Sequence, residues 1–60
     1  MEIHIVTHLH RGLLDTQEAF LDGIKANKRF AELCKEHGLP QDDPISENED
    51  VYIEEVEVNA

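Results

Sequence analysis

Residues 3–10 read Ile-His-Ile-Val-Thr-His-Leu-His, and this stretch decides the fold. Its side chains divide into two alternating sets. One set is Ile3, Ile5, Thr7 and Leu9, and the other is His4, Val6, His8 and His10. Alternation with a period of two, in a segment rich in β-branched residues, is typical of a β-strand. We therefore predict a strand here, with the first set facing a covering helix and the histidines on the open face.

A turn and a second strand are expected next. Glycine at Arg11-Gly12 permits positive φ, which favours a turn, and a strand can follow from about residue 14 to 21. The polar middle of that strand suits the edge of a sheet. The alternative is one helix over 16–37, because Asp15 and Glu18 have capping-box spacing. Gly23 opposes this alternative, since glycine costs about 1 kcal/mol inside a helix.

The segment 23–37 has the clearest helical pattern. Its apolar residues lie on two neighbouring rows of a helix, opposite a charged face. Asp22 is placed to cap its start, and Gly38 followed by Pro40 is placed to end it. These signals predict a helix over 23–37 with its apolar side against the sheet.

The last third contains a loop and a third strand. Residues 39–48 hold two prolines and no periodicity, which predicts a loop, and residues 50–58 are rich in β-formers. The apolar positions change parity at Glu54-Glu55, and a β-bulge there would restore one continuous apolar face. The alternative is a core face made by Tyr52, Val56 and Val58, with Glu54 near the edge.

Together these elements predict one α+β domain over residues 1–60. The expected architecture is a two-layer ββαβ fold with a three-stranded antiparallel or mixed sheet in the order 2-1-3. One helix packs on one face of this sheet. A homodimer could bury the other face.

Charge is distributed unevenly along the chain. Residues 1–38 hold six acids and five bases, whereas residues 39–60 hold eight acids and no base, which accounts for nearly all of the net charge of −9. These eight acids are the predicted partner-binding residues: Asp42, Asp43, Glu47, Glu49, Asp50, Glu54, Glu55 and Glu57. Such a surface repels nucleic acid and anionic membranes and favours a basic protein surface, for example on a nucleic-acid-binding protein. Solvated charge that only keeps a small protein in solution is the competing interpretation.

Histidines supply the second candidate site. His4, His8 and His10 share one face of the first strand, and converging imidazoles can bind zinc or nickel. The alternative to an acidic binding module is therefore a homodimeric accessory protein whose histidine face binds a transition metal or forms the interface. Otherwise no cofactor is expected. No catalytic motif is present, so we do not expect an enzyme, and the single cysteine, Cys34, suits a reducing cytoplasm.

Two segments resemble parts of known small proteins. The run Glu18-Ala19-Phe20-Leu21-Asp22, with Ala26, Phe30 and Leu33 after it, resembles the strand, cap and helix of short uncharacterised bacterial and phage proteins. The ending at residues 52–58 is similar to their last strand. The resemblance implies the ββαβ order and no catalytic residue. In size and acidity the chain is also similar to phage anti-defence proteins, including anti-CRISPR inhibitors and DNA mimics.

Overall fold

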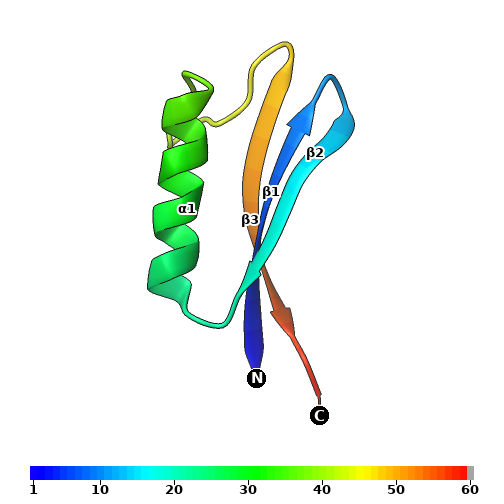
Figure 1. Cartoon of the computed structure of the whole chain (residues 1–60), viewed down its shortest axis with the longest axis vertical. Coiled ribbons are helices and arrows are strands. Elements are labelled where there is room, and N and C mark those ends of the chain that lie inside the picture. The colour runs from blue at the N-terminus through cyan, green and yellow to red at the C-terminus, as the bar shows by residue number, and fades with distance from the viewer. Residues whose placement is uncertain (60) are drawn as a thin grey trace.

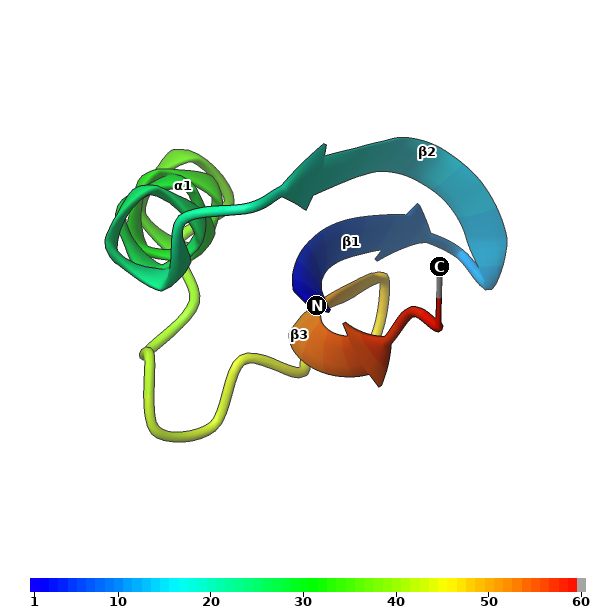
Figure 2. The same cartoon turned by 90° about the horizontal axis from the view of Figure 1, so that it is seen from below.

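The protein is a three-stranded sheet with a helix on one side. The computed structural model describes residues 1–59, so Ala60 lies outside the described residues. Within them the elements are β1 (Glu2–His10), β2 (Leu13–Phe20), α1 (Gly23–Glu36) and β3 (Glu49–Glu57). β1 lies between β2 and β3 and is antiparallel to both, which confirms the predicted order 2-1-3 (Figure 1). Figure 2 shows the helix beside the curled sheet, in the predicted two-layer arrangement. Across residues 1–59, no helix has the length and apolar character that crossing a membrane requires.

The boundary between β2 and α1 falls where the strand interpretation placed it. Asp22 has extended backbone angles, and its Oδ1 accepts a hydrogen bond of 2.8 Å from the Ile24 amide. This contact satisfies one of the amides that the first helical turn leaves free. The helix ends at Glu36 with His37 as its C-cap, and Gly38 follows with φ of +67°. The alternative of one helix over 16–37 is therefore wrong.

The predicted orientation of β1 is also wrong, because the histidine face is the one that the helix covers. Val6 is fully buried and His8 is 1% exposed, while the ring of His4 lies against Gly23 at the start of α1. This face is therefore covered by α1 within one chain, and the homodimer stays a prediction. Hydropathy favoured the opposite orientation, but buried histidines can be accommodated where charged partners meet them.

The core lies between α1 and the face of the sheet that carries Val6. Val6, Val51 and Ala26 are fully buried, and Leu33 and Cys34 are almost so. Leu39, the first residue after the helix cap and Gly38, closes this core at 8% exposure. Leu39 thereby holds the beginning of the loop that follows α1 against the core. The amide of Leu39 also donates a hydrogen bond to the carbonyl of Cys34, which fixes the same point.

The β-bulge lies in β2 and not at Glu54-Glu55. The pairing of β1 with β3 runs without a break from Glu2–Glu57 to His10–Glu49. Val51 pairs with His8 on the helix side, and Val56 pairs with Ile3 on the other side. The change of parity therefore means that the apolar residues of a regular strand lie first on one face and then on the other. The irregularity falls where His8 pairs with Thr16 but Leu9 pairs with Leu14, which leaves Asp15 as the additional residue. A bulge of this kind redirects a side chain.

The turn between β1 and β2 gives a direct test of backbone strain. Arg11 has φ of +53° and Gly12 has φ of +79°, the signs of a type I′ hairpin turn. Arginine tolerates this region poorly, whereas asparagine is favoured in it. We expect Arg11→Asn to raise the free energy of unfolding by about 0.5–1 kcal/mol, measured by urea denaturation. Arg11→Gln removes the same charge without the conformational benefit, and an equal gain in that control would contradict the explanation.

Candidate functional site

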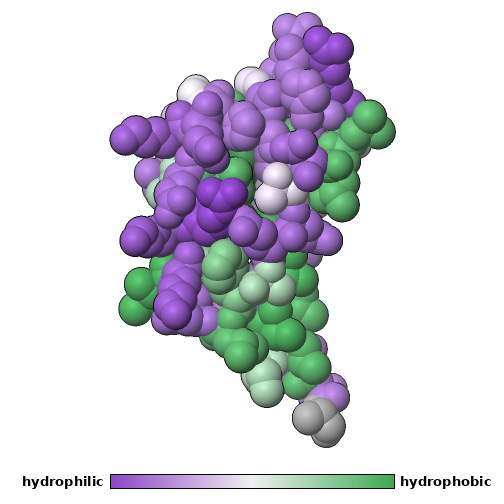
Figure 3. All heavy atoms as spheres, viewed as in Figure 1, coloured by the Kyte–Doolittle hydropathy of each residue, from purple (hydrophilic) through white to green (hydrophobic). Residues whose placement is uncertain are grey.

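The predicted acidic surface follows the loop after α1 and the exposed edge of the sheet. Asp42, Asp43 and Glu47 are exposed on the loop, and Glu54, Glu55 and Glu57 are exposed on β3. Asp50 is half-buried near the start of β3. β3 is an edge strand whose first residues pair with the loop at Ile45, and carboxylates from both of its faces border the rest of this edge. In Figure 3 hydrophilic residues cover most of the visible face, and apolar residues gather towards the end where the termini lie.

The acids of the last third are not neutralised by the chain's own strong bases. Among residues 1–59, no lysine or arginine lies within 4.0 Å of any of the eight carboxylates. Arg29 pairs instead with Glu18 of β2 and with two acids of its own helix. Glu57 contacts the amino terminus of Met1 at 3.0 Å. The carboxylates of the last third therefore form the negatively charged surface that the sequence predicted.

Glu49 differs from the other acids because it points inward. Its side chain is 18% exposed and its two oxygens meet three histidines. Oε2 accepts a hydrogen bond from Nε2 of His8, and Oε1 lies 2.7 Å from Nδ1 of His10. Nδ1 of His37 lies 3.8 Å from Oε2. We call His8, His10, His37, Glu49 and Asp15 the histidine–carboxylate cluster.

His8 is the buried centre of this cluster. Its Nδ1 donates to Oδ2 of Asp15 at 2.8 Å, while its Nε2 faces Glu49. The bulge in β2 leaves Asp15 as the residue without a pairing partner opposite β1. An ionised carboxylate can only accept hydrogen bonds, so two of them require a proton on each ring nitrogen. His8 is therefore an imidazolium held between two carboxylates in this arrangement.

Four elements bring the cluster together at one end of the molecule. β1 contributes two histidines, β2 contributes Asp15, His37 is the C-cap of α1, and β3 begins with Glu49. Figure 1 shows that these segment ends lie together near the β1–β2 turn and far from the chain termini. The rings of His8 and His37 are stacked, with centroids 3.9 Å apart and planes at 19°. The cluster thus joins β1, β3 and the end of the helix.

The electrostatics of the cluster favour its charged form. Burial acts to lower the pKa of His8, but hydrogen bonds and charge from Glu49 and Asp15 outweigh it and raise the pKa above 6.5. The hydrogen bond with His8 is the main cause that lowers the pKa of Asp15. The same bond is the main cause that lowers the pKa of Glu49, and His10 adds to it. Each partner therefore stabilises the ionised state of the others.

These shifts predict how the free energy of unfolding depends on pH. A chelator keeps metal ions away from the histidines during the measurement. The raised pKa of His8 gives stability that is full below 6.5 and is lost as pH rises through the folded-state pKa. The lowered pKa values of Asp15 and Glu49 give stability that is full above 4.5 and is lost as pH falls through theirs. The contribution of the cluster should thus be largest between pH 4.5 and 6.5.

Urea denaturation of the wild type and of His8→Phe across this range tests the expectation. The difference in unfolding free energy between the two proteins should pass through a maximum inside the window. A difference that does not change with pH would show that the ion pairs contribute nothing. The free energies of unfolding of the two proteins are subtracted at each pH. This subtraction cancels the pH dependence that comes from the remaining acids, because both proteins share them.

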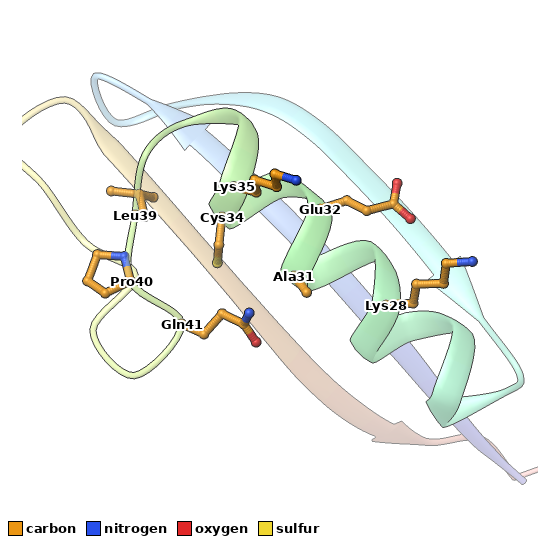
Figure 4. A pocket seen from close by; sticks show the side chains of 8 residues that line it. All are labelled: Lys28, Ala31, Glu32, Cys34, Lys35, Leu39, Pro40 and Gln41. Atoms are coloured by element: carbon orange, nitrogen blue, oxygen red, sulfur yellow. The ribbon is translucent and has the colours of Figure 1, made fainter.

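A groove of about 480 Å³ lies between α1 and the loop that follows it. Figure 4 shows Cys34 on the inner side of the helix, with Leu39, Pro40 and Gln41 of the loop around the groove and Lys28 and Lys35 directed outward. Burial raises the pKa of the Cys34 thiol, which is 1% exposed. A thiol without thiolate character is a poor nucleophile. Cys34 therefore serves the core here, and the groove gains no reactive group from it.

The structure divides the predicted metal ligands and adds others. His8 and His10 come together at Glu49, whereas His4 lies near the other end of β1, 3.8 Å from Glu55. Sequence reasoning missed His37 and Asp15 and assigned Glu49 to the partner surface. The available signals for these ligands were that His37 lies at the end of a helix and that Glu49 lies at the start of a strand. Neither signal reveals that the two side chains meet although eleven residues separate them in the chain.

Fold and site together define a small α+β domain with an acidic edge and an internal histidine–carboxylate cluster. A comparison with protein-family models found no match. Searches among curated proteins and solved structures also found none. The expected similarity to short bacterial and phage proteins stays a prediction.

Proposed function

We propose that this chain is a small binding module that docks its acidic loop and β3 edge on a basic surface of a partner protein and so inhibits or regulates it. The observation that carries the proposal is the absence, within residues 1–59, of lysine or arginine partners for the acids of the last third. Carboxylates without internal partners retain their attraction for an external cation.

The arrangement of the acids supports the same function. Successive residues on one face of a strand repeat at about 6.6 Å, and the loop extends the series beyond the start of β3. A row of carboxylates can occupy a groove that is built for a phosphate backbone. A nucleic-acid-binding protein is therefore the partner class that this surface suits. Glu49 is left out of the proposed contact because its oxygens face the histidines.

Charge-neutral variants test the proposal. In the loop variant, Asp42→Asn, Asp43→Asn and Glu47→Gln change the net charge from −9 to −6. The control variant, with Glu2→Gln, Glu32→Gln and Glu36→Gln, has the same net charge but keeps the loop intact. Each protein serves as immobilised bait for a set of purified nucleic-acid-binding proteins.

The expected result is that a basic protein binds the wild type and the control at about 50 mM salt and is released at about 0.5 M, because screening weakens contacts between charges. The same protein should bind the loop variant at least ten-fold more weakly, measured by titration calorimetry. Added duplex DNA should compete for the same site. Equal binding of both triple variants would rule out the loop as the contact surface.

A further inference from the structure

We propose that His8, His37 and Glu49, with His10 as the fourth ligand, form a binding site for Zn²⁺. The bound ion would link β1, the end of α1 and the start of β3. The first three residues each offer one ligand atom, and these atoms lie within 4.8 Å of one another. His10 contacts the same carboxylate at 2.7 Å. Three imidazoles and one carboxylate are a donor set that zinc accepts in tetrahedral sites.

The orientation of His8 supports a metal site independently of the ligand distances. Oδ2 of Asp15 accepts a hydrogen bond from Nδ1 of His8, and Nε2 is the nitrogen that faces Glu49. Zn²⁺ would replace the proton that Nε2 donates to Glu49, and this proton is released to solvent as the ion binds. A carboxylate behind a histidine in this way fixes the ring and makes its free nitrogen a better ligand. The bulge in β2 supplies this carboxylate from a position that regular pairing would have placed on the opposite face. Asp15 is therefore a positioning residue for the proposed ligand His8.

Binding requires a defined and small rearrangement. Tetrahedral ligands with bonds of about 2.0–2.1 Å lie about 3.3 Å from each other, so the cluster has to contract around the ion. The ring planes of His8 and His37 are stacked at 19° to each other, and His37 has to turn out of the stack for both rings to point at one ion. His37 caps the helix and its side chain is 28% exposed, so its ring has room to rotate. The half-exposed ring of His10 lies where an ion would enter from solvent.

The position of the site explains what the ion would contribute. It lies where β1, the end of α1 and the start of β3 meet, beside the loop that runs from α1 to β3 and is held by Leu39 and a few hydrogen bonds. Chains of this length bury a limited core, and a metal is one of the usual supports. The role inferred here is structural, and it is separate from the proposed acidic contact on the loop.

Titration of the full chain with ZnCl₂ tests the site. We expect one ion per chain by calorimetry and an unfolding temperature that rises with Zn²⁺ concentration, because the ion binds the folded state. Co²⁺ in place of Zn²⁺ should give the visible spectrum of a tetrahedral site without a thiolate band, which would exclude Cys34 as a ligand. The proton resonances of the His37 ring should shift as it leaves the stack.

Variants distinguish this site from weak binding by surface acids. His37→Ala and His10→Ala alter partly exposed residues, so both should remain folded by circular dichroism and bind Zn²⁺ at least ten-fold more weakly. Asp15→Asn should weaken binding about ten-fold or more and change the tautomer of His8 seen by ¹⁵N NMR. His4→Ala is the matched control, and its affinity should equal that of the wild type.

The proposal is overturned if His37→Ala and His10→Ala bind Zn²⁺ as tightly as the wild type. It is equally overturned if the loop variant with neutral residues 42, 43 and 47 loses the Zn²⁺ binding, since the ion would then sit on surface carboxylates. Loss of partner binding in that loop variant, with Zn²⁺ affinity intact, separates this inference from the proposed function.

Discussion

Leu33→Ala is expected to unfold much or all of the protein at room temperature. Leu33 is 2% exposed in the middle of the core between α1 and the sheet. Truncating a buried leucine to alanine costs about 2–5 kcal/mol, because packing contacts are lost and a cavity remains. A domain of this length has about 3–9 kcal/mol of total stability at ordinary values per residue. The loss is therefore comparable with the whole free energy of unfolding.

Far-UV circular dichroism during urea denaturation measures this effect. Ile24→Ala is the matched control, because Ile24 lies on the same helix but is 81% exposed. Its replacement removes a similar side chain from water and not from the core, so the change should stay within about 0.5 kcal/mol. Equal transitions for the two variants would mean that α1 does not pack on the sheet through Leu33.

Glu49→Ala is expected to have the second largest effect on stability, even though Glu49 is one of eight acids in the last third. Its removal leaves Nε2 of His8 without an acceptor at a site that is 1% exposed. An unsatisfied buried polar group costs about 1–3 kcal/mol. The variant should therefore unfold at clearly lower urea concentration than the wild type, in the presence of a chelator.

Glu47→Ala is the control for this second prediction. It removes the same charge two residues earlier, from an exposed side chain, and should change the unfolding free energy by no more than about 0.5 kcal/mol. Proton NMR adds a direct measurement, since the pKa of His8 should fall in Glu49→Ala and stay raised in Glu47→Ala. Similar stability and similar His8 titration in both variants would contradict the inward role of Glu49.

Much of the fold could be predicted because local signals agreed with each other. The Asp22 cap, the apolar rows of α1 and the glycine at position 38 marked the helix, and alternation marked β1. Once the order ββαβ was known, the handedness rule for connections left one sheet order, and the structure has it. The location of negative charge was equally readable, because the last third has no base of its own.

The amino-acid sequence by itself therefore determined the elements, their order and the uneven charge, each of which depends on neighbouring residues. The tertiary structure alone decided which face of β1 is buried, where the bulge lies and which side chains meet. Hydropathy placed the histidines outside, but His8 is stable inside because Asp15 and Glu49 offset the cost of burying its charge. Those partners are 7 and 41 residues away in the chain, and contacts over such separations follow from packing and not from local pattern.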